Sequence, residues 1–548
     1  MILERVYLIG LSGSGKTTLA PLLAERLGFE AVDIDAEVER RFGRSIPDIF
    51  TAFGEPVFRA AERDALAQAS RRTRVVVATG GGAVLDPANW DAMRPRSVIV
   101  HLTASPAVLI ERLEAAVRDT PMAERPLLRG DDPLARLESL WQARRHLYEQ
   151  ADLTIDTTST SLDTLAAHIA DQITALDRAG AIPVDSLGTP SGRSDLYAAP
   201  GLLAEVGTLA RRRWPKGRRA WVVADEHVLP LWGSSVEESF TQAGLDVAMR
   251  AVPAGEGSKA LAQVSDLLDW LLGGGIERGD MVVALGGGVV GDLAGFVAAI
   301  VLRGVGLVQL PTSLLAMVDS SVGGKTGVNH ALGKNLIGAF YQPPLVVADP
   351  HVLRTLPPRD LRNGWAEIVK HAMIECTATG ASEPILLPWL ERRNPVGGLG
   401  EPDELAELIA HNIRLKAAVV RADERESGLR RILNYGHTLG HAFEAAGYRY
   451  LHGEAVALGM RAAARLAHRL GLCDADLVAR QDALLDRLDL PRTFDGEWET
   501  VRTHLLHDKK VVQGTLTWIL PEGPGRVVVR RDVPLEAVEA VAREIGAR

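Results

Sequence analysis

Short apolar runs alternate with longer amphipathic stretches over the first 175 residues or so. The runs Val6–Ile9, Val75–Ala78 and Val98–Leu102 predict buried strands, and the last two are rich in Val and Ile. The stretches Leu19–Leu27 and Pro106–Val117 repeat apolar residues at helical spacing. Strands that alternate with helices in this way predict a parallel sheet covered by helices on both faces.

A second alternating region begins near residue 200. Its clearest strands are predicted at Ala220–Ala224, Met281–Leu285, Gly306–Leu310 and Leu345–Ala348. From about residue 360 onward helical periodicity dominates, with stretches at 404–422 and 454–470 and one short strand candidate at 516–520.

The polar, turn-rich segment 178–196 separates the two alternating regions and predicts an interdomain linker. We therefore expect an α/β protein. Residues 1–177 form a domain with a parallel sheet, residues 197–355 a second α/β domain, and residues 356–548 a mostly α-helical domain.

The composition narrows the class of protein. With 548 residues, 47% hydrophobic and 24% charged, the chain is typical of a soluble multidomain protein. Its formal net charge of -9 gives no reason to expect a nucleic-acid partner. Two cysteines exclude a disulfide framework and a cysteine zinc cluster, which fits a reducing cytoplasm. No apolar run approaches the ~20 residues of a membrane helix. The apolar run at the N-terminus leads directly into a glycine-rich motif, so it predicts a buried strand and not a signal peptide.

Residues Gly10–Thr17 fit the complete P-loop pattern between a predicted strand and a predicted helix. Glycines let backbone N–H groups surround phosphate oxygens, Lys16 supplies charge to the terminal phosphates, and the Thr17 hydroxyl suits Mg²⁺. This motif predicts a nucleoside triphosphate site.

Four further features follow the P-loop in order. Asp33 and Asp35 come after a short apolar step, Gly54–Glu62 places Arg59 beside a phenylalanine, Thr79–Gly82 follows a strand, and Arg118 and Arg125 bracket a lid-like polar segment. In this order and spacing they resemble shikimate kinase over nearly all of residues 1–175. Another small-molecule P-loop kinase and a nucleotide sensor remain alternatives.

The resemblance to shikimate kinase implies a role for each of these residues. Asp35 would orient the attacking hydroxyl of shikimate, and Lys16 and Arg125 would neutralise the transferred phosphoryl group of ATP. Mg²⁺ would lie near Thr17 and Asp33. Shikimate would be held by Asp35, Arg59, Gly80, Gly81, Gly82 and Arg144, and the nucleotide by Gly13, Ser14, Gly15, Lys16, Thr17, Thr18 and Arg118. The segment 156–160 lacks an arginine that some family members place near the nucleotide, so the adenine contacts there stay open.

A second glycine-rich turn, Ala284–Asp292, also joins a predicted strand to a predicted helix. This arrangement places a pyrophosphate on helix N–H groups, although the spacing differs from the usual dinucleotide fingerprint. Cationic and amide side chains follow among glycines, and they predict a pocket for a phosphorylated, polyhydroxy substrate: Arg303, Lys325, Lys334, Asn335 and Lys370.

Three of the 14 histidines lie within sixteen residues, at 437, 441 and 452. His437 and His441 are four apart and share one face of a helix, so spacing alone favours them as a pair of metal ligands. Glu367 is a candidate third ligand.

Together these features resemble 3-dehydroquinate synthase, from about residue 195 to 540. The resemblance implies a different ligand set for zinc, or cobalt in its place: Glu367, His437 and His452, with His441 facing the substrate phosphate. It implies NAD contacts at Asp225, Glu256, Lys259, Gly287, Gly288, Val289, Asp292, Thr312 and Ser313. It implies a substrate pocket made by Asp319, Lys325, Lys334, Asn335, Lys370, Lys416, Arg430, Asn434, His441 and Lys509.

The catalytic residues implied in this part are Lys325, Lys370, His441 and Arg303. Arg303 would reach the phosphate in a neighbouring subunit, so the resemblance implies a homodimer. The implied reaction converts 3-deoxy-arabino-heptulosonate 7-phosphate to 3-dehydroquinate and phosphate, with NAD reduced and regenerated. A related sugar phosphate cyclase and a metal-dependent polyol dehydrogenase are alternatives.

The sequence thus predicts a fusion of two enzymes of the shikimate pathway. We expect a P-loop kinase with a parallel sheet, then a Rossmann-like NAD-binding domain, then an α-helical domain that binds metal and substrate.

Overall fold

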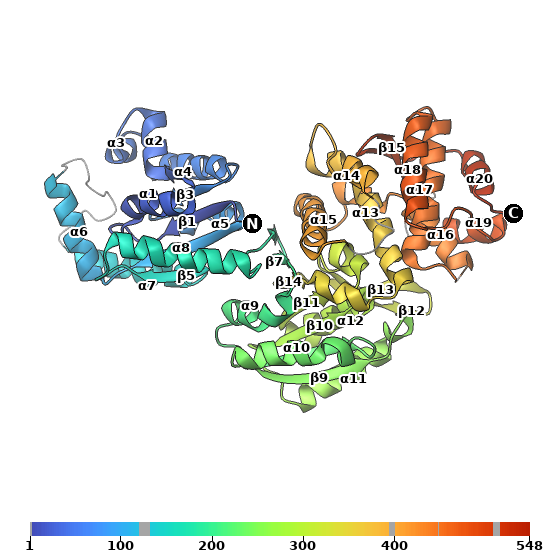
Figure 1. Ribbon diagram of the computed structural model, residues 1–548, viewed down its shortest axis with the longest axis horizontal. Coiled ribbons are helices and arrows are strands. Elements are labelled where there is room, and N and C mark those ends of the chain that lie inside the picture. The colour runs from blue at the N-terminus through green and yellow to red at the C-terminus, as the bar shows by residue number, and fades with distance from the viewer. Residues whose placement is uncertain (1–2, 120–131, 394–399, 448, 508–515) are drawn as a thin grey trace. The chain divides into compact units, whose positions relative to one another are not determined.

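The computed structural model describes residues 3–119, 132–393, 400–447, 449–507 and 516–548 and divides into two compact units, Met1–Ser186 and Leu187–Arg548 (Figure 1). Arg125 and Lys509 lie outside the described residues, as does the side chain of Arg118. No helix within the described ranges is both long and apolar enough to cross a membrane.

The first unit is built on a five-stranded parallel sheet in the order β2-β3-β1-β4-β5. The strands are Glu30–Asp33, Val75–Ala78, Arg5–Ile9, Ser97–Thr103 and Leu153–Asp156. The three strands predicted from apolar runs are confirmed as β1, β3 and β4. The short β2 and β5, which are partly exposed, were not predicted.

Alternation along β1 divides the core of this unit into two layers. Val6 and Leu8 face one cluster, which includes residues of α1 (Lys16–Leu27) and α8 (Leu162–Arg178). Tyr7 and Ile9 face the other cluster. That cluster includes residues of α2 (Ile34–Phe42), α3 (Ile46–Phe53), α4 (Glu55–Ala69), α5 (Pro87–Met93), α6 (Pro106–Asp119) and α7 (Pro133–Tyr148). Helices on both faces explain why β3 is apolar at every position and why β1 is buried from Val6 to Ile9.

The second unit contains a seven-stranded sheet in the order β6-β7-β14-β11-β10-β8-β9. The strands are Asp185–Thr189, Gly192–Ala198, Leu345–Ala348, Gly306–Pro311, Met281–Gly286, Arg219–Asp225 and Asp246–Val252, and β7 through β9 are parallel. The helices α11 (Leu261–Gly273) and α12 (Gly288–Ile300) pack on one face, and α9 (Val206–Arg213) and α10 (Leu229–Gln242) contact β14 and β8. A hairpin of β12 (Lys325–His330) and β13 (Gly333–Phe340) packs on α12. The four strands predicted here are confirmed.

The remaining part is mostly helical, as predicted. Its helices are α13 (Pro358–Thr379), α14 (Leu386–Arg392), α15 (Pro402–Ala422), α16 (His437–Gly447), α17 (His452–Arg469), α18 (Ala475–Arg487), α19 (Trp498–His507) and α20 (Leu535–Glu544). The strand candidate at 516–520 begins at Trp518 as β15 (Trp518–Gly523), which pairs with β16 (Arg526–Arg530).

The segment 178–196, predicted as an interdomain linker, contains the boundary between the compact units but forms regular strands. The helix α8 continues to Arg178, and the polar segment after it forms β6 and most of β7. The boundary between the compact units falls inside β6. Glycines, serines and a proline masked the strand pattern, because pairing to a neighbouring strand, and not local propensity, holds these residues extended.

Candidate active sites

The P-loop connects β1 to α1 in the geometry that its glycines permit. Gly13 and Gly15 have φ values of 83° and 93°, a backbone region that strains other residues. The Lys16 ammonium is buried and donates hydrogen bonds to the carbonyl oxygens of Gly10 and Leu11 at 2.9 and 3.0 Å. The phosphate oxygens of a bound nucleotide would compete with these carbonyl oxygens for the Lys16 ammonium. Thr17 and Thr18, at the start of α1, are exposed.

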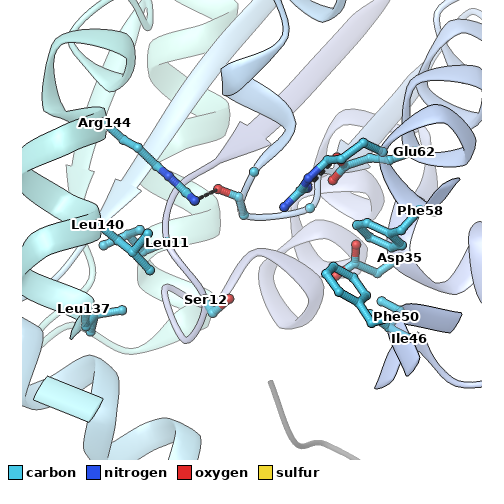
Figure 2. Close-up of a pocket in the computed structure, with 14 residues that line it drawn as sticks. Leu11, Ser12, Asp35, Ile46, Phe50, Phe58, Glu62, Leu137, Leu140 and Arg144 are labelled. Atoms are coloured by element: carbon cyan, nitrogen blue, oxygen red, sulfur yellow. Dashed lines mark hydrogen bonds and ion pairs between the residues drawn. The ribbon is translucent and has the colours of Figure 1, made fainter. Parts of the chain in front are cut away.

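Beside the P-loop, the segment Gly80–Gly82 forms one wall of a pocket (Figure 2). A Cβ atom on Gly80 would clash with a Glu62 oxygen and lie 2.9 Å from Asp35 Oδ1, and one on Gly82 would lie 2.5–2.6 Å from three atoms of the Arg59 guanidinium. Glycine is needed here because charged side chains approach the backbone closely. The pocket thus gathers the predicted residues Asp35, Arg59, Gly80, Gly81, Gly82 and Arg144.

Arg59 is fixed between two carboxylates of its own helix, α4. Its Nη1 donates to Glu62 Oε2 at 2.7 Å, and its Nη2 donates to Glu55 Oε1 at 3.0 Å. Burial raises the pKa of Glu62, and the Arg59 charge opposes that rise. The sequence pattern included Glu62, but no role was assigned to it. Its spacing of three residues from Arg59 was the available signal.

Arg144 enters the pocket from α7. Its Nη1 donates to the Gly81 carbonyl oxygen at 2.8 Å (Figure 2). The Tyr148 hydroxyl donates to the same oxygen at 3.2 Å. The Tyr148 ring stacks on His101 at the end of β4, with centroids 4.7 Å apart. Burial, with the Lys16 charge as a smaller cause, lowers the pKa of His101 to about 4.

Apolar side chains complete the walls of this pocket. Phe58 is the phenylalanine of the Gly54–Glu62 motif, and the others had no predicted role: Ile46, Phe50, Leu137 and Leu140. These side chains, Phe58 included, come from α3, α4 and α7, so only the packing of those helices brings them together. The Asp33 carboxylate, predicted near Mg²⁺, accepts a hydrogen bond from the Ala36 N–H at the start of α2.

The segment 156–160, which lacks the arginine of some shikimate kinases, is held by an arginine from elsewhere. Arg112 of α6 donates to the Thr157 hydroxyl at 3.0 Å and to the Thr157 carbonyl at 2.5 Å. The Thr157 hydroxyl also lies 3.4 Å from the Ser14 carbonyl oxygen of the P-loop. Arg112 therefore fixes this segment against the P-loop.

In the second unit, the turn at Gly287 and Gly288 begins α12 at the carboxyl end of β10. A Cβ on Gly288 would lie 2.9 Å from Ser320 Oγ, so the backbone is closely approached here too. The buried Lys259 ammonium lies 2.7 Å from Asp292 Oδ2 and 2.6 Å from Asn335 Oδ1, and it thereby joins three predicted residues.

The other residues predicted to contact NAD come from neighbouring strand ends. Asp225 ends β8, and Thr312 follows β11, where its N–H donates to the Gly286 carbonyl oxygen. Ser313 Oγ would lie 3.4 Å from a Cβ on Gly287. Val289 lies in the first turn of α12, and Glu256 accepts a hydrogen bond from Asn329. The carboxyl ends of parallel strands are the usual place for a nucleotide crevice.

Glu367, His437 and His452 come together from α13, α16 and α17. Their ligand atoms all lie within 4.8 Å of one another, and Glu367 Oε1 is 3.6 Å from His437 Nε2 and 3.4 Å from His452 Nε2. Ligands of a tetrahedral zinc at ~2.0–2.1 Å are about 3.3 Å apart, so these separations fit a shared metal ion. Glu367 Oε1 is buried and accepts no hydrogen bond from the described residues, which also suits a metal ligand.

His441 is not in this set, although its ring centroid is 5.3 Å from that of His437. Of the two histidines that spacing suggested as a ligand pair, His437 therefore belongs to the ligand cluster, and His441 lies at its edge.

A buried group of alternating charges adjoins the carboxylate of Glu367. Lys370 Nζ lies 2.5 Å from Glu367 Oε2 and 3.7 Å from Asp319 Oδ1, and Lys416 Nζ lies 2.6 Å from Asp319 Oδ1. Burial would raise the pKa of Asp319, but the two ammonium groups hold it well below its usual value. Burial lowers the pKa of Lys416 to about 8, although Asp319 opposes this. The sequence predicted all three polar residues around Glu367 but not their mutual contacts.

Two carboxylates, to which the sequence analysis assigned no role, pair with lysines that were predicted to bind the substrate. Glu426 pairs with Lys325 and accepts a hydrogen bond from Asn434 at 2.6 Å. Glu444 lies 2.5 Å from the Lys334 ammonium. The spacing of Glu444, seven residues after His437 and thus on the same face of α16, was the available signal.

The two predicted arginines of this unit differ in their environments. Arg430 is buried and donates to the Gly323 carbonyl oxygen at 3.0 Å. Arg303 is exposed after α12, and its φ of 67° follows a φ of 49° at Leu302.

Three family models match the chain. They are shikimate kinase over residues 12–174, the N-terminal part of 3-dehydroquinate synthase over 249–363, and the C-terminal part of 3-dehydroquinate synthase over 364–511. The 3-dehydroquinate synthase of Symbiobacterium thermophilum is 49% identical over 352 residues, which are 63% of this chain and 96% of that protein.

Two solved structures resemble the second unit. A 2-deoxy-scyllo-inosose synthase complexed with carbaglucose-6-phosphate, NAD⁺ and Co²⁺ is 28% identical, covers 66% of this chain and 99% of its own, and has a TM-score of 0.60. A 2-epi-5-epi-valiolone synthase from Streptomyces hygroscopicus, with NAD⁺ and Zn²⁺ bound, is 28% identical, covers 65% of this chain and 98% of its own, and has a TM-score of 0.59. The chain therefore joins two enzymes of the shikimate pathway: its second unit belongs to the 3-dehydroquinate synthase family, and its first unit is a shikimate kinase domain.

Proposed function

We propose that the first unit transfers the terminal phosphoryl group of ATP to the 3-hydroxyl of shikimate. The observation that carries this proposal is the pocket beside the P-loop, in which Arg59, Arg144 and Asp35 meet around Gly80–Gly82. A guanidinium fork matches a carboxylate, and a pocket lined by two arginines, Asp35 and the Arg59 partner Glu62 suits a small polyhydroxy acid.

In this reaction each side chain has a separate task. Arg59 and Arg144 bind the carboxylate of shikimate and fix its ring. Asp35 accepts a hydrogen bond from the attacking hydroxyl and takes its proton as the new O–P bond forms. Lys16 leaves the carbonyl oxygens of Gly10 and Leu11 for the phosphates, with Mg²⁺ near Thr17. Phe50 and Phe58 limit the access of water, which would otherwise compete as the nucleophile.

We propose that the second unit converts 3-deoxy-arabino-heptulosonate 7-phosphate to 3-dehydroquinate and phosphate. The carrying observation is the Glu367, His437 and His452 cluster beside the buried group of Lys370, Asp319 and Lys416. Two imidazole nitrogens and a carboxylate oxygen suit zinc or cobalt. NAD would bind along Gly287, Gly288, Lys259 and Asp292.

When both are bound, the metal would polarise a substrate oxygen, and NAD would accept a hydride and later return it. This transient oxidation would lower the barrier to elimination of phosphate. The chain itself binds and orients the substrate. Lys370 and Lys416 face its hydroxyl oxygens, and the sets around Lys325 and Lys334 provide cations for its phosphate and carboxylate. Because these ammonium groups are already in position before the reaction, they stabilise negative charge that develops on the substrate oxygens and so lower the activation barrier.

A related sugar phosphate cyclase is the second candidate, because one structural neighbour is a synthase complexed with a sugar-phosphate analogue, NAD⁺ and Co²⁺, and the other is a synthase with NAD⁺ and Zn²⁺ bound. Identity of 49% to a 3-dehydroquinate synthase, against 28% to those neighbours, favours the first assignment. A polyol dehydrogenase has no phosphate to bind and would not need Lys325, Lys334 and Arg303. We further propose a homodimer in which the exposed Arg303 reaches the neighbouring subunit.

Both proposals are tested on the purified full-length chain. Addition of 3-deoxy-arabino-heptulosonate 7-phosphate should release phosphate and 3-dehydroquinate without net NADH. Addition of shikimate should stimulate ATP turnover and yield shikimate 3-phosphate. Accumulated NADH without phosphate release would contradict the synthase assignment, and ATP turnover that ignores shikimate would contradict the kinase assignment.

A further inference from the structure

The carboxylate of Glu444 has two partners at the edge of the candidate metal site. Its Oε2 lies 3.3 Å from His452 Nδ1, and its Oε1 lies 2.5 Å from Lys334 Nζ. The Glu444 side chain is 19% exposed and that of His452 33%, so their contact is partly shielded from water, whereas the Lys334 side chain is 56% exposed. Glu444 thereby connects a candidate metal ligand on α17 to the β12–β13 hairpin.

An imidazole that binds a metal through one nitrogen needs a partner for the other. A partner that accepts the Nδ1 hydrogen leaves the Nε2 lone pair available and fixes the plane of the ring. His452 has this arrangement, since Nε2 faces Glu367 at 3.4 Å while Nδ1 faces Glu444.

His437 has the same need, and the backbone meets it. Its Nδ1 lies 3.0 Å from the Tyr435 carbonyl oxygen, and its Nε2 faces Glu367. A side-chain substitution does not remove a carbonyl oxygen, but it does remove a carboxylate. The outward contact of His452 is therefore the one that can be tested by mutation.

We propose that Glu444 is a positioning residue of the metal site, which holds His452 with Nε2 directed at the shared ion and ties Lys334 to the same carboxylate. This inference rests on the proposed metal-dependent function of the second unit. The carboxylate raises the basicity of the imidazole and prevents rotation of the ring. The contact with Lys334 restrains the carboxylate in turn, so that the hairpin and the metal ligand keep a fixed separation.

The test measures the zinc affinity of the full-length chain by competition with a chelator, and does not depend on turnover. Glu444→Ala should weaken zinc binding by about 10- to 100-fold, the effect usual for loss of such a partner. Glu444→Gln keeps an oxygen that can accept the Nδ1 hydrogen and should weaken binding less. With Co²⁺ in place of zinc, the visible spectrum of Glu444→Ala should differ from that of the unsubstituted chain, because the ring is no longer held.

The matched control is Glu426→Gln, which removes a carboxylate that lies against Lys325 and Asn434, whereas the carboxylate of Glu444 lies against His452. Its zinc affinity should stay unchanged. Equal losses in Glu426→Gln and Glu444→Gln would overturn the inference, because the effect would then come from charge alone. Unchanged zinc affinity in Glu444→Ala would overturn it as well.

Two outcomes separate this inference from the proposed function. An unsubstituted chain that binds no zinc contradicts the metal-dependent function itself. A chain that binds zinc, with variants at Glu444 that bind it equally well, contradicts only the positioning role. If Glu444→Ala does not fold, as judged by loss of its synthase unit on thermal unfolding, the comparison of Glu444→Gln with Glu426→Gln decides.

Discussion

Replacement of Gly82 by alanine should impair shikimate binding through a displacement of Arg59. The added Cβ would lie 2.5–2.6 Å from three guanidinium atoms, whereas ordinary contact begins near 3.4 Å, so the guanidinium must move by about 1 Å. The clash involves the end of a flexible side chain and not the backbone. The fold should therefore persist while Arg59 leaves its position between Glu55 and Glu62.

The magnitude follows from the interaction that is lost. A hydrogen bond to a charged group contributes about 1.5–3 kcal/mol, which corresponds to a loss of roughly 10- to 150-fold in kcat/KM for shikimate. The KM for ATP should stay the same, because Arg59 is hydrogen-bonded to Glu55 and Glu62 of its own helix. The assay is steady-state kinase kinetics with varied shikimate, and the synthase activity of the same preparation reports on the integrity of the chain.

A double-mutant cycle with Arg59→Lys tests whether the effect of Gly82→Ala on shikimate binding acts through Arg59. Lysine keeps the charge but lacks the planar fork, so Arg59→Lys alone should also weaken shikimate binding. If alanine at position 82 acts only through Arg59, the double variant should be no worse than Arg59→Lys. Additive losses, or a Gly82→Ala enzyme with unchanged shikimate kinetics, would refute the placement of Arg59 at the substrate.

Three further predictions concern other parts of the chain. Glu367→Ala should bind zinc at least about 100-fold more weakly and lose synthase turnover, while kinase activity remains; metal analysis that shows full zinc retention would contradict the ligand assignment. Lys16→Met should lower the kinase kcat by about 10²- to 10³-fold and leave phosphate release by the synthase unchanged, as paired assays would show. Burial and Lys16 hold the pKa of His101 at about 4, below its value of 6.5 in an unfolded chain, so its contribution to stability is present above pH 6.5 and is lost as the pH falls toward 4. The temperature at which kinase activity is lost should therefore drop less between pH 7 and pH 5 in His101→Phe than in the unsubstituted chain, and equal drops would contradict this.

The strands and helices that could be predicted were those with strong local patterns. Continuous apolar runs gave β3 and β14 with correct bounds, because strands covered on both faces need apolar residues at every position. By contrast, β6 and β7 carry glycine and serine, and they are extended because they pair with neighbouring strands. Local propensity does not encode that pairing, so the segment resembled a linker.

The candidate sites divide in the same way. Sequence alone determined the P-loop, the glycine segments and the identity of most of the charged residues, because each lies in a short motif whose chemistry depends on spacing within a few residues. It also located the histidine cluster, from which spacing favoured His437 and His441 as partners.

Only the tertiary structure decided which of these residues meet. Helices α13, α16 and α17 bring Glu367, His437 and His452 within ligand distance of one another, although 85 residues separate the first of them from the last. The fold also pairs Glu426 with Lys325 and Glu444 with Lys334, and these contacts join residues about 100 positions apart in the sequence. Periodicity describes one helix at a time, whereas a metal or substrate site is made by side chains that converge from several elements, and their convergence is fixed by the packing of the core.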